Sequence, residues 1–241
     1  MAEVVVVSIG AMSYNELWGE REPVRTGHAT TSLVRTSDAV ILVDPGLPAP
    51  ALRARLEERT GLSVDAVTHV FLTSFRPDVR CGLELFERAE WLISAVERET
   101  VGLPMAEDLK RLAEAGALDD EADEESRAIS ARLQREVALL QRCRPAPDSI
   151  APGVDLFPLP GVTAGMTGLL IPSSRGDILI CGDAIPTAGH IAAGRAPLRC
   201  QNPEAARESL REAIEIADFL IPGRDNLMPN PVRRMFAGPV G

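Results

Sequence analysis

The stretch "THVFLTSFRPDVRCG", from Thr68 to Gly82, decides the fold assignment. A short apolar run centred on Phe71 is typical of a strand, and a cramped loop with a proline and a carboxylate follows it. Many enzymes present metal ligands in such loops. Here, however, the loop offers a serine, an arginine and a valine where an imidazole would be needed. The stretch therefore predicts the frame of a site and raises the question of whether its chemistry is still present.

Strand and helix signals alternate around this stretch. Residues 3–9, 29–36 and 39–46 predict strands, and the polar turn at Ser37 and Asp38 makes the last two a hairpin. Residues 48–61 predict a helix with Leu52 and Leu56 on one face and a terminating Gly61. A further strand is expected in "AEWLIS". This order is typical of a layered α/β or α+β domain.

The last third of the chain is again sheet-like. Strands are expected in "GVDLFPLPG", "GLLIP", "DILICGDA" and "DFLIPG", after a proline-rich connector, "PAPDSIAPG". Asn202 and Pro203 form an N-cap and first-turn pair. The helix that they begin should bury Leu210, Ile214 and Ala217.

A change of composition marks residues 105–144, where acidic residues crowd "EAGALDDEADEES" before a helical pattern resumes. Ile129, Leu133, Val137 and Leu140 form one apolar stripe. The segment is either a solvated helical hairpin over one end of the core or an oligomer or partner surface. We predict one domain, residues 1–241, with this acidic helical insertion at about 105–144.

Charge and cysteine usage restrict the partners and the compartment. The net charge of -10 argues against nucleic acid or an anionic membrane as the main partner. Cys81, Cys143, Cys181 and Cys200 show no CxxC spacing and are read as reduced thiols. Neither a signal peptide nor a membrane span is recognisable, so we expect a cytoplasmic protein.

Short segments with a shared layout occur in order along the chain: "VDPG" (43–46), the opening stretch, "LPGVTAGMTG" (159–168), "ICGDA" (180–184) and "IPGRDN" (221–226). Each is an apolar strand that runs into a glycine- or carboxylate-bearing loop. Together they resemble the metallo-β-lactamase fold superfamily, in particular the single-domain branch related to glyoxalase II. The resemblance implies an α+β (α/β) fold, an αββα sandwich of two mixed sheets with helices outside, and relatives that are mostly metal-dependent hydrolases.

The family's metal-binding pattern is degenerate in this chain. The resemblance places Ser74, Arg76 and Val79 at the histidine positions of a His-x-His-x-Asp-His loop. Val162 and Arg224 stand at the other two histidine positions. The family's aspartates are retained as Asp78 and Asp183, and Asp44 matches the aspartate of the turn beneath the site.

These replacements change what the site can bind. Valine has no lone pair, and arginine is permanently protonated, so neither can ligate zinc or iron. We therefore expect no metal cofactor, apart from a divalent cation held weakly by Asp78 and Asp183. Two like charges at about 4 Å and an effective dielectric of about 20 repel by roughly 4 kcal/mol. We predict that Arg76 and Arg224 fill the metal volume and pair with both aspartates.

Two alternatives concern the same residues. The arginines could point to solvent, with the aspartates capping loops or one of them protonated. A relocated metal site could use Cys81, Cys181, Asp78, Asp183 and His190, although strand alternation places Cys181 and Asp183 on one side only if the strand stays regular. His190 lies in a loop that should border the cleft and is a candidate to face a ligand.

The sequence argues against catalytic activity, because every histidine of the family pattern is replaced. The preferred interpretation is a pseudoenzyme that binds a small anionic or polar molecule through Arg76, Arg224 and Ser74, or a protein partner. One alternative is a metal-dependent hydrolase with a rearranged site. Another is a structural protein that forms a homodimer through the insertion, which gains weight if the four charges pair only with one another and leave no donors.

Overall fold

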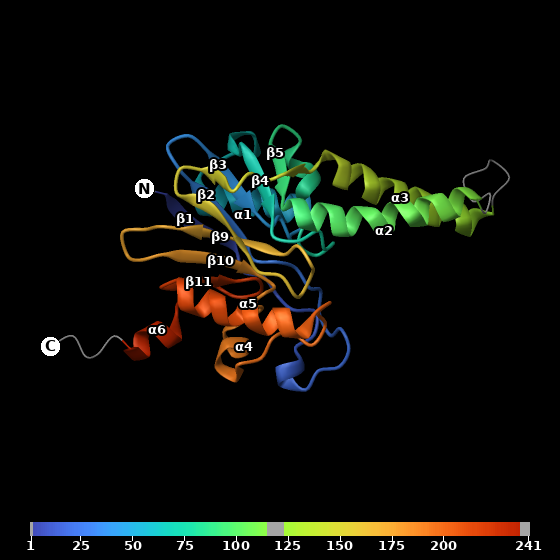
Figure 1. Cartoon of the computed structure of the whole chain (residues 1–241). Helices are drawn as coiled ribbons and strands as arrows, with labels where there is room; N and C mark the ends of the chain where they lie inside the picture. The colour runs from blue at the N-terminus through green and yellow to red at the C-terminus, as the bar shows by residue number, and fades with distance from the viewer. Residues whose placement is uncertain (1, 115–122, 237–241) are drawn as a thin grey trace.

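The computed structural model describes residues 2–114 and 123–236 (Figure 1). The strands of the first sheet are β1 (Glu3–Ser8), β2 (Thr31–Arg35), β3 (Val40–Val43), β4 (His69–Leu72), β5 (Glu90–Ile93) and β6 (Arg144–Pro145). The strands of the second sheet are β7 (Ser149–Ala151), β8 (Val154–Pro158), β9 (Thr167–Ile171), β10 (Ile178–Gly182), β11 (Phe219–Pro222) and β12 (Met228–Pro229). The α-helices are α1 (Ala49–Thr60), α2 (Ala95–Glu114), α3 (Glu124–Arg142), α4 (Ala188–Ala193), α5 (Pro203–Ile216) and α6 (Pro231–Phe236). Short 3-10 helices are η1 (Glu16–Trp18), η2 (Val64–Ala66) and η3 (Leu83–Phe86).

Both sheets are mixed. The first has the order β1-β2-β3-β4-β5-β6, antiparallel from β1 to β3 and parallel from β3 to β6. The second has the order β12-β11-β10-β9-β8-β7, in which only β10 and β11 run parallel. Helices lie on the outer sides (Figure 1). The predicted αββα sandwich is confirmed.

Strict alternation along the buried strands builds the layers, because successive side chains point to opposite faces. In β4, Phe71 packs between the two sheets, whereas Val70 and Leu72 pack with Leu52 and Leu56 of α1 on the outside. The second sheet repeats the pattern. The central cluster takes Ile178, Ile180 and Ile221, and the outer cluster with α5 takes Leu179, Cys181, Leu220 and Leu210.

Several local predictions are confirmed. Strands β2 and β3 form the hairpin, and Gly61 ends α1 with a left-handed φ of 69°. Asn202 caps α5 by accepting from the backbone N–H groups of Glu204 and Ala205. On that helix Leu210 is buried and Ile214 packs against the same cluster, and the adjoining Ala217 is buried too.

The helical hairpin of α2 and α3 differs from the predicted insertion in its boundary. It begins at Ala95 rather than near residue 105, because Pro104 lies inside α2 and does not end it. Figure 1 shows the two helices side by side, projecting away from the sheets. The predicted stripe is only partly covered, since Leu140 is buried and Ile129 is 51% exposed. Most of the acidic stretch falls on residues 115–122, outside the described residues.

Other segments were missed. The proline-rich connector overlaps the end of β6 and contains β7, which pair with β5 and β8, and no sequence signal indicated α4. Both strands have at most three residues, too short for a periodicity signal.

None of the described helices combines the length and the apolarity needed to cross a bilayer.

Candidate functional site

Five polar side chains are brought together by loops at the carboxyl ends of paired strands. Asp44 follows β3, and Arg76 and Asp78 follow the parallel neighbour β4. On the second sheet Asp183 follows β10, and Arg224 follows the parallel neighbour β11. Because parallel strands end at the same edge, residues distant in sequence meet there.

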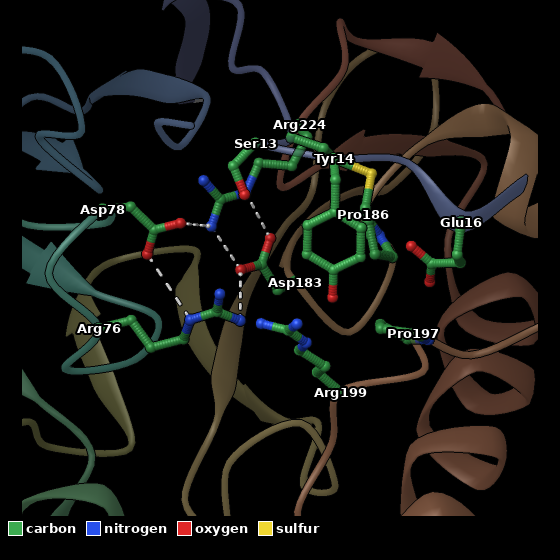
Figure 2. Close-up of a pocket in the computed structure, with 11 residues that line it drawn as sticks. Ser13, Tyr14, Glu16, Arg76, Asp78, Asp183, Pro186, Pro197, Arg199 and Arg224 are labelled. Atoms are coloured by element: carbon green, nitrogen blue, oxygen red, sulfur yellow. Dashed lines mark hydrogen bonds and ion pairs between the residues drawn. The ribbon is translucent and has the colours of Figure 1, made fainter. Parts of the chain in front are cut away.

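Arg76, Asp78, Asp183 and Arg224 form a network that we call the arginine–aspartate tetrad (Figure 2). Arg224 binds Asp183 in a bidentate manner, with Nε–Oδ1 at 2.7 Å and Nη2–Oδ2 at 2.6 Å. Its Nη2 also lies 2.8 Å from Asp78 Oδ2. The predicted pairing of both arginines with both aspartates is confirmed.

Arg76 closes the tetrad from its exposed side. Its Nη1 lies 3.2 Å from Asp183 Oδ2, and its Nε lies 3.6 Å from Asp78 Oδ1. The Arg76 side chain is 40% exposed, whereas that of Arg224 is only 4% exposed. The alternative that both arginines point to solvent is therefore wrong.

Burial and charge oppose each other in the tetrad. Burial alone would raise the pKa of Asp183, but the Arg224 guanidinium, helped by Arg76, holds that pKa below its usual value. Burial would lower the pKa of Arg224, and the charges of Asp183 and Asp78 raise it instead. Both groups are therefore charged at neutral pH. The buried Nη1 of Arg224 has no hydrogen-bond partner among the described residues.

Asp44 lies beneath the tetrad, and no arginine of the described residues forms an ion pair with it. It accepts hydrogen bonds from the backbone N–H and the hydroxyl of Thr73, at 2.8 and 2.7 Å. Its backbone is left-handed, with a φ of 54°, a conformation that Asp adopts more readily than most residues. Burial raises its pKa to about 7, because the Thr73 hydrogen bonds offset only part of the desolvation. Asp44 thus ties the end of β3 to the end of β4.

Two further carboxylates fix the loop that carries Arg76 and Asp78. Glu97 of α2, 1% exposed, accepts from the backbone N–H of Phe75 at 2.9 Å and of Gly165 at 3.1 Å. Arg80 donates to the Phe75 carbonyl at 3.0 Å and pairs with Glu136 of α3. Both helices of the projecting hairpin therefore hold the site loop in place.

A cavity of about 130 Å³ opens above the tetrad. All four tetrad members line it, together with Met12, Ser13, Tyr14, Glu16, Pro186, Pro197 and Arg199. Figure 2 shows Tyr14 and Arg199 on the side opposite Asp78.

Three of the seven predicted pocket positions do not line this cavity, and neither do the supporting residues Asp44 and His190. Ser74 is fully buried, and its hydroxyl has no hydrogen-bond partner among the described residues, so it does not face the cavity. Val79 packs in the cluster that contains Leu52 and Leu56, and Val162 packs in the cluster beneath α5. Apolar side chains at these positions extend the core instead of facing the opening.

His190 is also placed differently from the prediction. It lies on α4, fully buried, with Nδ1 at 2.9 Å from the Thr187 hydroxyl and Nε2 at 3.4 Å from Glu16 Oε1. The short helix turns the imidazole inward, so His190 does not line the cavity. It holds Glu16, which does.

Sequence reasoning missed the outer wall of the cavity. Ser13, Tyr14 and Glu16 come from the segment between β1 and β2, and Arg199 comes from the segment between α4 and α5. The Arg199 guanidinium lies over the Tyr14 ring, 4.8 Å from its centroid. Neither segment has a periodic pattern or a motif that would have indicated it.

The cysteines do not build a relocated metal site. Cys181 packs in the outer cluster beneath α5, where burial raises the pKa of its thiol, and Cys143 is buried as well, with a pKa of about 11. The strand alternation turns Cys181 away from the central layer. Within residues 2–114 and 123–236, no group of three or more His, Cys, Asp or Glu side chains is placed to hold a metal ion.

Comparisons with known proteins agree with this architecture. The model of the family described as "Metallo-beta-lactamase superfamily" matches residues 24–222. The chain therefore belongs to the metallo-beta-lactamase superfamily, as the sequence resemblance predicted. No curated protein matches it.

Solved structures with a similar fold share little sequence with it. A suspected metallo-beta-lactamase from Thermotoga maritima has a TM-score of 0.62 at 18% identity, covering 95% of this chain and 99% of its own. AidC, a dizinc quorum-quenching lactonase in complex with the product N-hexanoyl-L-homoserine, has a TM-score of 0.60 at 18% identity, with coverages of 89% and 82%. AiiA of B. thuringiensis, with N-decanoyl-L-homoserine at its active site, has a TM-score of 0.58 at 16% identity, with coverages of 93% and 92%. At these identities the likeness concerns the fold alone.

Proposed function

We propose that this chain is a metal-free member of its superfamily, a pseudoenzyme in which the arginine–aspartate tetrad replaces the metal ions. Its cavity binds a small anionic or polar molecule and does not hydrolyse it. The observation that carries the proposal is the position of the Arg224 guanidinium, which contacts Asp183 and Asp78 at once. Two carboxylates facing one cleft need a cation, and here a fixed organic cation supplies it.

The donor set supports the absence of a metal cofactor. Ser74, Arg76, Val79, Val162 and Arg224 stand where the family pattern has histidines. Valine offers no lone pair, and a guanidinium only donates, so these residues do not fit zinc or iron. The two aspartates are engaged by guanidinium groups, which disfavours even a weakly held Mg²⁺ or Ca²⁺ between them.

Hydrolysis would need an activated nucleophile, and among the described residues neither Ser74, His190 nor Cys181 lines the cavity. The metal-dependent hydrolase with a rearranged site loses support from the buried, core-facing position of Cys181. Ser74 is buried away from the cavity, and His190 is engaged with Thr187 and Glu16. A serine nucleophile without a base in reach is inactive. We therefore assign binding and no catalytic step to this site.

Donors remain for a ligand although the tetrad pairs internally. The guanidinium of Arg76 is partly exposed to the cavity, and Arg199 adds a third positive charge that the sequence did not predict. The condition that would have favoured a purely structural protein, that no donors are left over, is thus not met.

A structural or oligomerisation protein is the second candidate, and the projecting hairpin favours it. Leu103 and Ile129 are 60% and 51% exposed on α2 and α3. A second cavity, of about 610 Å³, lies along these helices next to Pro77 and includes Met105 and Leu133 in its wall. A homodimer through this surface would cover these side chains.

For the location of the protein we propose the cytoplasm, where the free cysteines stay reduced.

Metal analysis of protein purified without added metal tests the proposal directly. We expect zinc, iron and manganese far below one equivalent per chain, also after incubation with zinc and desalting. Addition of MgCl₂ should leave the melting temperature unchanged. Near-stoichiometric zinc, iron or manganese would contradict the proposal.

A thermal-shift screen with small organic acids should yield stabilising ligands. A flat response, together with a dimer mass in light scattering, would favour the second candidate.

A further inference from the structure

The outer wall of the cavity carries a positive charge without an acidic partner. Arg199 is exposed, and in the part of the chain that the structure describes no carboxylate lies within ion-pair distance of it. Its contact is with the Tyr14 ring, at 4.8 Å. In Figure 2 the guanidinium groups of Arg199 and Arg76 point toward each other beneath Asp183, and both line the same cavity. Two cations that face one small opening create a demand for an anion.

The nearby acids are engaged by other partners and do not pair with Arg199. Asp183 is used by Arg224 through both oxygens and also contacts Arg76, and Asp78 contacts the same two guanidiniums. Glu16 lines the cavity, but its Oε1 accepts from the Leu198 N–H at 3.1 Å and lies next to His190. The three arginines and three acids that line the cavity balance overall, but Glu16 forms no ion pair with Arg199 among the described residues, so the positive excess is local to the space between Arg76 and Arg199. A single negative charge fits this balance, whereas a dianion would also face the two tetrad carboxylates.

The dimensions of the cavity restrict the rest of the ligand. A volume of about 130 Å³ admits a small organic molecule rather than a single water. Met12, Pro186 and Pro197 supply apolar wall, and the tetrad closes the floor. A planar carboxylate with a short alkyl group matches both parts, because a guanidinium binds a carboxylate with matched geometry.

We propose that the cavity binds a short-chain monocarboxylate, with its carboxylate between Arg199 and Arg76 and its alkyl group against Met12 and Pro197. The proposal rests on the proposed function, since it requires the metal-free tetrad as the floor of the cavity. It specifies the ligand class of that site and makes Arg199 the residue that selects it.

The test is an NMR or calorimetric titration of the full chain with propionate, its neutral isostere propionamide, and inorganic phosphate. Propionate should bind at least tenfold more tightly than either of the others, and added salt should weaken it. Arg199→Gln should weaken propionate binding at least tenfold, and because Arg199 is exposed the variant should fold normally. Arg195→Gln, an exposed arginine of the same segment outside the cavity wall, is the matched control and should bind like the wild type.

Equal affinity of propionate and propionamide, stronger binding of phosphate, or unchanged binding by Arg199→Gln would each overturn this inference. These outcomes are distinct from a failure of the proposed function, which metal analysis reveals independently. A metal-free protein that binds other small molecules but not propionate would refute the ligand class alone.

Discussion

Asp44, after β3 of the first sheet, and Asp183, after β10 of the second, are both buried carboxylates of the site, yet their protonation differs. Burial raises the pKa of Asp44 to about 7, while contact with Arg224 and Arg76 holds the pKa of Asp183 below its usual value. The difference is the contact with a guanidinium, because hydrogen bonds from Thr73 alone do not offset the desolvation of Asp44. A buried acid in this site therefore stays fully charged at neutral pH where the chain supplies a guanidinium, and is in part protonated where it does not.

Removing the Arg224 guanidinium should have the largest effect on the stability of the fold. Arg224→Met leaves Asp183 buried with only the partial pairing of Arg76 and should destabilise the fold by about 3 kcal/mol, measured by urea unfolding. Adding Asp183→Asn to this variant should recover part of the loss, since no buried charge then remains. A single variant as stable as the wild type, or a double variant less stable than the single one, would show that the pair does not stabilise the fold.

The pH dependence of stability distinguishes the two acids. The pKa of Asp44 is about 7 in the folded chain and 3.8 when unperturbed, so the folded state holds a proton that the unfolded state releases. Its contribution is fully present below pH 3.8 and is lost as the pH rises through about 7. The slope for one proton is about 1.4 kcal/mol per pH unit. Asp183, with a lowered pKa, contributes stability above pH 3.8 that is lost in acid.

Asp44→Asn should remove the first of these effects. Asn tolerates the left-handed backbone and preserves the shape. The free energy of unfolding of the wild type, minus that of the variant, should therefore decrease as the pH rises from 5 to 8. Urea unfolding at each pH measures it. A difference that does not change with pH would mean that Asp44 is ionised throughout this range.

The smallest effect is expected on the exposed side of the tetrad. Arg76→Gln removes ion pairs of 3.2 and 3.6 Å from a side chain that is 40% exposed, so solvent already screens them. We expect a loss below about 1 kcal/mol, well under that of Arg224→Met. Equal losses for the two variants would show that burial does not set the strength of these pairs.

The resemblance placed the four tetrad residues in one site, and the chemistry of their side chains then predicted the pairing. Valine and arginine cannot ligate metal, and two facing aspartates need a positive charge, so the pairing of Arg76 and Arg224 with them followed before any coordinates. The αββα sandwich was implied by the resemblance to the metallo-β-lactamase superfamily, whereas the strand and helix patterns alone predicted a layered α/β or α+β domain. The predictions of the tetrad and of the sandwich both depend on residue types at positions that the family pattern defines.

Prediction was limited where placement depends on tertiary structure. His190 was expected at the cleft because it follows the strand that carries Asp183, but the helix α4 turns it inward. Tyr14 and Arg199 lie far apart in sequence and in segments without periodicity, so nothing marked them as neighbours. The start of the hairpin was misplaced since Pro104 is accommodated within α2.

The tetrad joins a loop of the first sheet to two loops of the second. Arg224 and Asp78 are distant along the chain, and their contact can form only after the two sheets have docked. An interaction that forms only after this docking is a late one, and late interactions change the unfolding rate more than the folding rate. The tetrad should therefore act mainly as a brake on unfolding, lengthening the lifetime of the native state with little influence on how quickly it is reached.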